Sequence, residues 1–346
     1  MLKKKWLSLA LTLSLAALAG CSQNGSSTSA TGGDTASTDK DSKTYKIAIS
    51  QIVEHPSLDA TREGFVAALK DAGIVEGQNL TLDYNNAQGD STNNLSIAQK
   101  LASAKNDLVF AIATPSAQAV AAQVKETPVV FAAVTDPVSA KIVASMDKPG
   151  ANITGASDTN PEAIKQLADF IAEQLPNIKT IGVVLNEGEP NAVVMTDRAE
   201  KEFGAHGIKL VKAAVTNTSE VQQAAQSLVG QVDALYITLD NTVVSAVDTI
   251  IKIANDNKLP FFSSDRDTVE KGAFATVGFK YYDHGYQAGE MAVQILKDGK
   301  KPADLPVTMQ EKLDLILNLK AAEAQGIQVT DEMKSKVQDQ ANNLIQ

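Results

Sequence analysis

Short apolar runs that alternate with helix-like stretches constrain the fold of this chain more than any other feature. Several of these runs are apolar at every position, as expected for parallel strands buried on both faces. The runs that predict strands are 46–49, 80–84, 108–113, 129–134, 180–185, 208–213, 234–237, 260–262 and 273–277. The stretches that predict helices are 57–72, 91–104, 116–125, 161–175, 191–206, 219–229 and 242–255. This alternation predicts an α/β fold with parallel sheets.

The strand–turn–helix pattern occurs twice along the chain. Ile47 and Gly73 recur 134 residues later as Ile181 and Gly207, and each pair frames a strand, a turn and a helix. Both glycines stand where a C-capping glycine commonly ends a helix. The part of the chain after residue 44 has about 300 residues, which is large for a single domain. The recurrence therefore predicts two similar α/β lobes in series.

The N-terminal segment predicts export and lipid attachment. Lysines at 3–5 precede an apolar run at 6–19, which is shorter than the roughly 20 residues of a membrane-spanning helix. The sequence Leu-Ala-Gly-Cys at 18–21 resembles a bacterial lipobox, in which the cysteine takes a diacylglycerol and becomes the mature N-terminus. We predict a signal peptide at 1–20 and a lipidated Cys21 carrying fatty acids such as palmitate. The alternative is an ordinary signal peptide with Cys21 nearby by chance.

Residues 21–43 are predicted to be the lipidated cysteine and a flexible tether. This stretch is rich in Ser, Thr, Gly, Asn, Asp and Lys, and it has too few apolar residues to offset the entropy of ordering. Random-coil arithmetic gives it a reach of about 25 Å. It would hold a folded body at the extracytoplasmic face of the cell membrane, at the cell surface or in the periplasm depending on the envelope.

The charge and the cysteine count exclude several classes of function. Removal of residues 1–20 takes away three lysines and no acid, which changes the net charge from −10 to −13. An acidic body argues against nucleic acid and anionic lipid headgroups as partners. The one cysteine is assigned to the lipid, and the three histidines are scattered. No metal or other cofactor is therefore expected.

Polar residues collect directly after the predicted strands. In open α/β sheets, ligands bind beyond the carboxyl ends of the strands. Two lobes whose strand ends face each other would line a cleft with these residues. Ser, Thr, Asp and Asn at such positions also cap the next helix, so each residue has a structural alternative. The predicted ligand-binding residues are Gln51, Thr114, Pro115, Ser116, Thr135, Asp136, Asp158, Asn186, Asn191, Asp240, Asn241 and Asp265.

Several blocks of this sequence, within about 46–305, match a known family in order and spacing. They are 55–59, 113–118, 128–137, 149–158, 179–183 followed by Asn186, Glu189 and Asn191, and 239–242. The most specific parts are Val-Thr-Asp-Pro at 134–137 and Asn-Ile-Thr-Gly at 152–155. These blocks resemble the TrpX-like family of ABC-transporter substrate-binding lipoproteins. The resemblance implies a type I periplasmic-binding-protein fold, in which two lobes of parallel sheet flanked by helices enclose a ligand cleft. It also implies capture of an amino acid, often an aromatic one, for an ABC import permease.

The resemblance also suggests how the chain divides between the lobes. Lobe one is expected to contain 44–156 and 281–313, and lobe two 157–280 and 314–346, with crossings near Ala156, Lys280 and Leu315. The protein is expected to be a monomer. The sequence Ser-Ser-Asp-Arg at 263–266 departs from the tryptophan-binding members of the family, which leaves the identity of the ligand open.

An amino-acid ligand needs donors for its carboxylate and an anion for its ammonium group. The helix start at Thr114-Pro115-Ser116 offers free amides for the carboxylate. Asp158, Asp136 and Asp265 are candidates for the ammonium, and Asp240 is the first choice, with Asn241 or Thr242 capping the following helix. Phe131 and Phe279 are expected in the core more than in the site. Arg266 is expected to contact a carboxylate or to pair with Asp265 or Asp267.

Other classes of function have less support in the sequence. An enzyme is not expected, because there is no Gly-x-Ser-x-Gly elbow, and neither His55 nor His284 has a nucleophile partner. No Gly-x-Gly-x-x-Gly follows a strand, which excludes a Rossmann dinucleotide enzyme. A module that reports to a sensor instead of a permease stays open, as does a sugar or nucleoside ligand. The leading interpretation is a solute-binding protein for an L-amino acid, with tryptophan first among aromatic or large apolar side chains.

Overall fold

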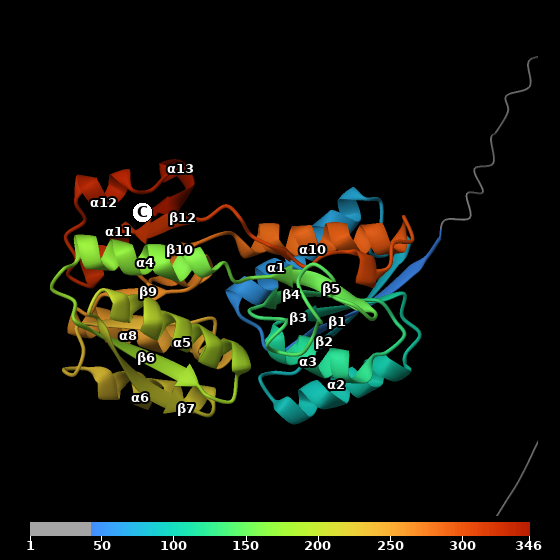
Figure 1. Ribbon diagram of the computed structural model, residues 1–346, viewed down its shortest axis with the longest axis horizontal. Helices are drawn as coiled ribbons and strands as arrows, with labels where there is room; N and C mark the ends of the chain where they lie inside the picture. The colour runs from blue at the N-terminus through green and yellow to red at the C-terminus, as the bar shows by residue number, and fades with distance from the viewer. Residues whose placement is uncertain (1–42) are drawn as a thin grey trace, which may run out of the picture. The chain divides into compact units, whose positions relative to one another are not determined.

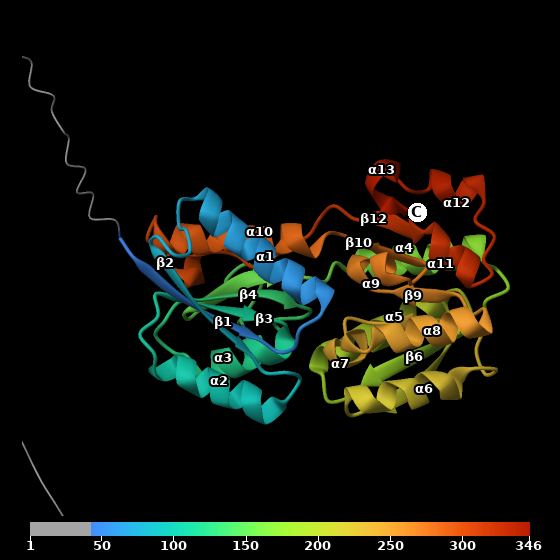
Figure 2. The ribbon, with the colours of Figure 1, turned by 180° about the vertical axis from the view of Figure 1, so that it is seen from behind.

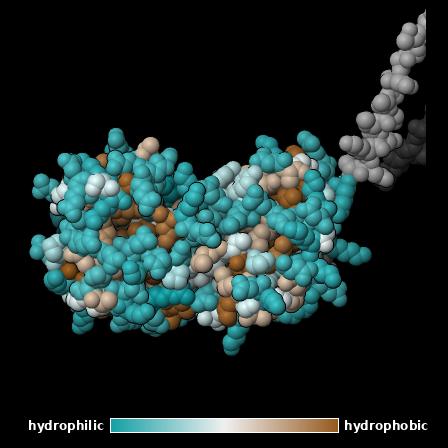
Figure 3. Space-filling model, turned by 45° about the horizontal axis from the view of Figure 1, so that its top comes forward, coloured by the Kyte–Doolittle hydropathy of each residue, from teal (hydrophilic) through white to brown (hydrophobic). Residues whose placement is uncertain are grey.

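The computed structural model describes residues 43–346, which form two lobes that each contain one β-sheet covered by helices on both faces (Figure 1). The α/β class and the two-lobed architecture predicted from the sequence are confirmed. Among residues 43–346, no helix is both long enough and apolar enough to cross a membrane. The face in Figure 3 is largely hydrophilic, with hydrophobic residues gathered in small patches and in a hollow on lobe two.

Lobe one is built on a six-stranded parallel sheet with the order β11-β5-β4-β3-β1-β2. Its strands are β1 (Tyr45–Gln51), β2 (Leu80–Asn86), β3 (Leu108–Ile112), β4 (Val129–Val134), β5 (Ile153–Ser157) and β11 (Thr308–Met309). Apolar side chains of α1 (Pro56–Asp71) and α10 (Tyr281–Leu296) pack on one face of this sheet. Those of α2 (Ser91–Ser103) and α3 (Thr114–Gln123) pack on the other. A 3-10 turn, η2 (Pro302–Asp304), precedes β11.

Lobe two is built on a seven-stranded sheet with the order β13-β12-β10-β9-β8-β6-β7. Only the pairing of β10 with β12 is antiparallel. Its strands are β6 (Thr180–Asn186), β7 (Lys209–Val215), β8 (Ala234–Ile237), β9 (Phe261–Ser263), β10 (Ala275–Gly278), β12 (Asp314–Asn318) and β13 (Leu344–Ile345). Both faces are covered by helices, so the sheet is buried between two layers.

One helical layer of lobe two comes mainly from α4 and α5, and the other from α6 to α9. The first layer is α4 (Pro161–Gln174) and α5 (Pro190–Ala205), joined by α11 (Leu319–Ala324) and α12 (Asp331–Ser335). The second is α6 (Val221–Leu228), α7 (Asn241–Ser245), α8 (Val247–Asn257) and α9 (Arg266–Lys271). The 3-10 turn η1 (Thr218–Glu220) leads into α6, and α13 (Gln340–Asn343) leads into β13.

The two sheets repeat the same strand order, as the recurrence in the sequence predicts. Ile47 pairs with β2 and β3, and Ile181 pairs with β7 and β8 in the same way. The orders β2-β1-β3-β4-β5 and β7-β6-β8-β9-β10 therefore match. Gly73 and Gly207 end their helices with φ values of 79° and 73°, which an L-residue with a side chain rarely adopts.

All nine predicted strands are present, but several elements were missed. Strand β5 has the sequence Ile-Thr-Gly-Ala-Ser, which carries little β-propensity at its centre. Gly155 is needed there because a Cβ atom would lie 2.2 Å from the carbonyl oxygen of Phe131. The strands β11 to β13 and the helices α9 to α13 were also not predicted. The single helix predicted at 242–255 is wrong, because Ala246 breaks it into α7 and α8.

Three segments connect the lobes, at 158–160, 279–280 and 310–313, and Figure 2 shows them between the two sheets. The Tyr281 hydroxyl, at the start of α10, donates to Asp158 at 3.1 Å. Asn160 Nδ2 donates to the carbonyl oxygen of Gln310 at 3.1 Å. The first crossing is therefore hydrogen-bonded to residues at the other two, and we call the three crossings together the hinge.

Helices α1 and α10 pack with their backbones in contact. A Cβ atom on Gly64 would lie 2.0 Å from the carbonyl oxygen of Tyr282, and one on Gly285 would lie 1.9 Å from that of Thr61. Only glycine allows such an approach. This contact fixes the start of α1 against the start of α10, and both helix starts lead into the space between the lobes.

Replacement of Gly285 by alanine is expected to destabilise the protein, because the new methyl group would overlap the backbone of α1. We expect a loss of about 3 kcal/mol in the free energy of unfolding. Chemical denaturation measures it. The control is Gly204→Ala, in α5, where a Cβ atom meets nothing within 4 Å. That variant should be as stable as the wild type or slightly more so. Equal midpoints for Gly285→Ala and the wild type would contradict this account of the packing.

Candidate functional site

A small cavity lies between the lobes, beside the hinge, and we call it the inner cavity. It has a volume of about 20 Å³, which is room for about one water molecule. Both lobes and the hinge supply its walls. Its lining residues are His55, Ser57, Leu58, Ala133, Thr135, Asp158, Asn191, Leu239, Asp240, Asn241, Val244, Asp265 and Tyr281. Six of the residues predicted from the sequence meet here: Thr135, Asp158, Asn191, Asp240, Asn241 and Asp265.

Direct contacts hold the two lobes together around this cavity. Ser57 Oγ in lobe one donates to Asp265 Oδ1 in lobe two at 3.1 Å. His55 Nε2 lies 3.4 Å from Asn241 Oδ1. At the edge of the cleft, Arg198 forms an ion pair with Asp136 at 3.0 Å. These contacts and the small volume of the cavity describe a closed arrangement of the lobes.

Two buried polar atoms in the inner cavity have no hydrogen-bond partner, and both are acceptors. The side-chain amide of Asn191 donates to Glu189 and to the carbonyl oxygen of Leu239, at 3.0 and 2.7 Å. This orientation leaves Asn191 Oδ1 buried and unpaired.

The second unpaired acceptor is His55 Nδ1. The amide of Asn241 donates to Glu189 at 2.6 Å, so Asn241 Oδ1 is an acceptor and the proton of the contact with His55 is on Nε2. Burial lowers the pKa of His55, so the ring is neutral at pH 7 and its Nδ1 carries a lone pair. A buried acceptor that lacks a partner is costly, which indicates a ligand with N–H or O–H donors.

Asp158 is a buried carboxylate without a neighbouring cation. One oxygen accepts from Tyr281 at 3.1 Å, the other accepts a long bond of 3.4 Å from Thr159, and the side chain of Thr135 also favours the charged form. None of the residues that line the inner cavity is a lysine or an arginine. Burial raises the pKa of Asp158 to about 6, because the charged form loses hydration without gaining an opposite charge.

The carboxylates of Asp240 and Asp265 are occupied by protein donors. Asp240 accepts from the backbone amides of Val243 and Asn186, at 3.0 and 2.5 Å. It is thus the cap of α7 itself, and the predicted capping by Asn241 or Thr242 is wrong. Burial and the nearby Glu189 raise the pKa of Asp240 well above its usual value.

Asp265 caps α9 by accepting from the amide of Thr268 at 2.8 Å. It also accepts from Ser57 and from Ser263, the latter at 2.8 Å. Arg266 does not pair with either neighbouring aspartate. Its guanidinium binds Glu270 at 2.6 Å and the C-terminal segment at Asn342 and Asn343.

The remaining predicted residues lie outside the inner cavity. Gln51 bonds to Val53, Asp59 and Arg62 within lobe one. The hydroxyl of Thr114 accepts from the amide of Thr135 at 3.3 Å, and that of Ser116 donates to Asn94 at 3.2 Å. Asp136 lies at the edge of the cleft in its pair with Arg198. Pro115 and Asn186 line a wide outer cavity of about 750 Å³. Cys21 lies outside the described residues.

No residue at the start of α1 was among the predicted ligand-binding residues. Pro56 occupies the first turn of α1, and the preceding residue, His55, makes no capping bond through its side chain. Ser57 and Leu58, in the first turn, line the inner cavity. Because the first amides of a helix have no partner within the helix, this 16-residue helix offers N–H donors there. The sequence His-Pro-Ser could have indicated this helix start, because proline is common at the first helical position.

Ala133 brings strained backbone to the cavity wall. Its φ angle is 56°, and the pairing of β4 with β5 shifts register around it. Its amide donates to Nε2 of the buried His284 at 3.1 Å. Burial lowers the pKa of His284 to about 4, so this ring is neutral at pH 7. Its Nε2 can therefore accept the hydrogen bond from the amide of Ala133. His284 therefore has a structural partner of its own.

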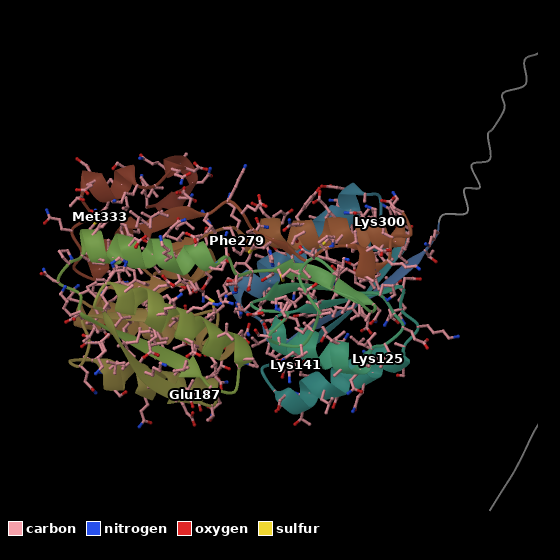
Figure 4. All side chains as sticks on the ribbon, viewed as in Figure 1. Lys125, Lys141, Glu187, Phe279, Lys300 and Met333 are labelled. Carbon is pink, nitrogen blue, oxygen red and sulfur yellow. The ribbon has the colours of Figure 1, made fainter. Side chains whose placement is uncertain are left out.

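A second small cavity, which we call the apolar cavity, adjoins the inner cavity through two shared residues, Asp158 and Leu239. Its volume is also about 20 Å³. Figure 4 shows Phe279 at the junction of the lobes, and this side chain is part of the wall, whereas Phe131 is in the core of lobe one. The apolar part of the lining is Ala163, Ile164, Leu167, Met195, Leu239, Val277 and Phe279.

Comparisons with known proteins agree with this fold. The model of the family described as ABC transporter substrate binding protein matches residues 46–340. A tyrosine-binding protein of Clostridioides difficile strain R20291 is 40% identical over 94% of each chain. A crystal structure of a conserved domain protein from Vibrio cholerae is 43% identical, with a TM-score of 0.82 over 86% of this chain and 99% of the other. A glucose-galactose binding protein of Geobacillus stearothermophilus, 19% identical with a TM-score of 0.59 over 80% and 98%, shares the fold.

Two further solved structures allow the arrangement of the lobes to be compared. A domain from Streptococcus pneumoniae in complex with L-Trp is 33% identical, with a TM-score of 0.81 over 86% of this chain and 99% of the other. The ligand-free, open structure of a Clostridium difficile substrate-binding protein is 40% identical, but its TM-score is 0.63 over 87% and 98%. The more identical protein superposes less well, which agrees with the closed lobes of this structure. Because the family model matches nearly all of the described residues, the chain belongs to the ABC transporter substrate-binding protein family.

Proposed function

We propose that this protein is a lipid-anchored, extracytoplasmic binding protein that captures an aromatic L-amino acid and delivers it to an ABC import permease. Membership of the substrate-binding family supports the transport role. A relative named for tyrosine and a structure in complex with L-Trp support the class of ligand. The observation that carries the proposal is the set of unsatisfied acceptors in the inner cavity, next to a carboxylate without a cation.

The inner cavity suits the ammonium group of an amino acid. An ammonium group has three N–H donors, and Asp158, His55 Nδ1 and Asn191 Oδ1 are three acceptors with spare capacity. Its positive charge would also compensate the buried carboxylate of Asp158. A sugar hydroxyl would need acceptors and donors in similar numbers, so an acceptor-rich wall favours an ammonium ligand.

Asp158 is a better partner for the ammonium than Asp240, the first choice from the sequence. Both oxygens of Asp240 already accept from backbone amides, whereas the donors to Asp158 are side-chain hydroxyls, and the bond from Thr159 is long at 3.4 Å. Asp158 also lines both cavities, so an ammonium beside it leaves the apolar cavity free for a side chain.

The ligand carboxylate would bind at the start of α1. Ser57 and Leu58 line the inner cavity, and the first turn of this long helix presents free amides and a partial positive charge. In this arrangement α1 takes the role that the sequence gave to Thr114-Pro115-Ser116. Lobe one would then bind the carboxylate, and the ammonium would lie at the hinge.

The aromatic side chain would occupy the apolar cavity. A volume of about 20 Å³ is too small for an aromatic ring, so the ring would bind while the lobes are open and Leu239 and Phe279 can shift. Closure of the hinge would then enclose the ligand, as in other hinge-bending proteins.

Replacement of Asp158 by asparagine is expected to weaken binding of L-tyrosine and L-tryptophan, because it removes the charge and keeps the shape. The loss of a charge-assisted bond should cost about 1.5–3 kcal/mol, or roughly ten- to a hundredfold in Kd. Isothermal titration calorimetry of the purified protein measures it. The control is Asp331→Asn, a fully exposed aspartate in α12, which should bind as the wild type does. Unchanged affinity in Asp158→Asn, or no binding of either amino acid, would contradict the proposal.

Binding should also weaken in acid. The pKa of Asp158 is raised to about 6 in the unliganded protein, so the folded state favours the protonated form of this side chain. The contribution of that protonated form to the stability of the folded protein is lost as the pH rises through 6. An adjacent ammonium favours the ionised form, so binding below pH 6 must release a proton. The Kd should rise about tenfold per pH unit below 6 and stay flat above 7. Calorimetry between pH 4.5 and 8 tests this, and a wild-type profile as flat as that of Asp158→Asn would argue against it.

Lipid attachment is expected to depend on Cys21. The basis is Leu-Ala-Gly-Cys at 18–21 after a basic and apolar leader. Because Cys21 is the only cysteine, Cys21→Ala leaves no thiol for lipid, and the protein should move from the membrane fraction to the soluble fraction or stay as precursor. Fractionation of cells and labelling with palmitate measure this. A Cys21→Ala protein that sediments with membranes as the wild type does would refute the lipobox.

A further inference from the structure

We propose that the paired hydroxyls of Tyr236 and Ser264 select the ligand by its side chain, in favour of a hydroxylated aromatic ring such as that of tyrosine. This inference rests on the proposed function and refines it. Both residues line the apolar cavity, and their paired hydroxyls have hydrogen-bonding capacity that the protein does not use.

Both residues are held in place by lobe two. Tyr236, in β8, is fully buried, and its ring packs edge-on against Phe203 of α5, with the ring centroids 5.4 Å apart. Ser264 directly follows β9, the strand next to β8. The two hydroxyl oxygens are 2.5 Å apart and form a hydrogen bond. A rigid strand and a buried ring therefore fix the position of this polar pair.

The hydrogen bond between the two hydroxyls does not use all of their donors and acceptors. Two hydroxyls have two donors and four acceptor sites, and their mutual bond uses one of each. Among residues 43–346, neither hydroxyl makes another hydrogen bond to a side chain or to the backbone. The pair thus retains one O–H donor and lone pairs. The apolar side chains around it offer no partner.

The other hydroxyls of the cavity are less suited to bind a ligand, because they already have protein partners. Ser263 is engaged with Asp265, as donor at 2.8 Å and as acceptor at 3.2 Å. Thr276 donates to the carbonyl oxygen of Val277 at 3.4 Å and is fully buried in the sheet. Thr159 donates to Asp158 at 3.4 Å and contacts Met195, and Asn160 caps α4. The pair of Tyr236 and Ser264 is therefore the part of the wall that keeps an O–H donor without a protein acceptor.

The leftover donor and acceptors match a phenol group. A phenolic hydroxyl both donates and accepts, so it can satisfy the spare O–H and a lone pair together. An indole N–H only donates, and it would leave the spare O–H without a partner. A phenyl ring would remove water from the pair and return no hydrogen bond, which is costly. The expected order of affinity is tyrosine, then tryptophan, then phenylalanine.

One amino acid can reach both polar ends of the site. Asp158 lines the apolar cavity together with Tyr236 and Ser264, and it also lines the inner cavity. The ammonium group at Asp158 and a phenol at the paired hydroxyls would thus mark the two ends of one ligand, with the ring between apolar side chains such as Leu167 and Val277. Sites built to bind a substrate hydroxyl reject analogues that lack it far more strongly than apolar pockets reject a missing methylene.

The test is calorimetric titration of wild-type protein and Tyr236→Phe with L-tyrosine, L-tryptophan and L-phenylalanine. The wild type should bind tyrosine at least about tenfold more tightly than phenylalanine. Tyr236→Phe keeps the ring and its contact with Phe203, so it should weaken tyrosine binding about tenfold and leave phenylalanine binding within about twofold. The ratio of the two affinities should therefore fall towards one.

Two further variants make the outcome decisive. Ser264→Ala removes the other hydroxyl from a half-buried position and should lower the same ratio, even where Tyr236→Phe folds poorly. Tyr286→Phe is the matched control, because its hydroxyl binds Asp71 on the surface of lobe one, and it should leave the ratio unchanged. Equal wild-type affinities for tyrosine and phenylalanine, or an unchanged ratio in both cavity variants, would overturn the inference. No binding of any aromatic amino acid would overturn the proposed function and this inference with it.

Discussion

The hydrogen bond from Tyr281 to Asp158 links the hinge, the two lobes and the site. Asp158 lies on the first crossing between the lobes, and Tyr281 begins α10 directly after the second. Helix α10 is in turn locked to α1 by backbone contacts that only glycine permits at positions 64 and 285. Since α1 begins at the inner cavity, the orientation of its first turn depends on the same set of contacts. The hinge and the candidate site are therefore one structural unit.

The environment of each carboxylate decides its role in the cleft. Glu189 accepts from the amides or hydroxyls of Asn191, Asn241 and Thr242, and Asp240 accepts from two backbone amides. These donors satisfy the charge within lobe two. Asp158 receives hydrogen bonds from the hydroxyls of Tyr281 and nearby threonines but has no neighbouring cation, and burial raises its pKa. A ligand that brings a positive charge lowers the cost of ionising Asp158 in the closed form, so binding and closure favour each other.

Sequence patterns predicted the fold well and the site only in part. Continuous apolar runs such as 129–134 identify buried parallel strands, and the recurrence of Ile47 and Gly73 identifies the repeated lobe. The sequence could not distinguish the aspartates that cap helices from Asp158, which has no neighbouring cation. The reason is that the partners are distant in sequence: the amide that binds Asp240 belongs to Asn186, 54 residues away. It also missed α10, where glycines that weaken a lone helix are required by contact with α1. Such roles depend on tertiary contacts that no local pattern records.

The division of the walls between the lobes suggests an order of events in binding. Every residue that lines the apolar cavity belongs to lobe two or to the hinge, so this cavity can receive a side chain before the lobes meet. The inner cavity needs both lobes, because His55, Ser57 and Leu58 come from lobe one and Asn191 and Asp265 from lobe two. Under the proposed function, lobe two would bind the ring first, and closure would then bring the amides of α1 to the carboxylate. The bond from Ser57 to Asp265 joins the two lobes, so it stabilises the same closed state that the ligand would complete.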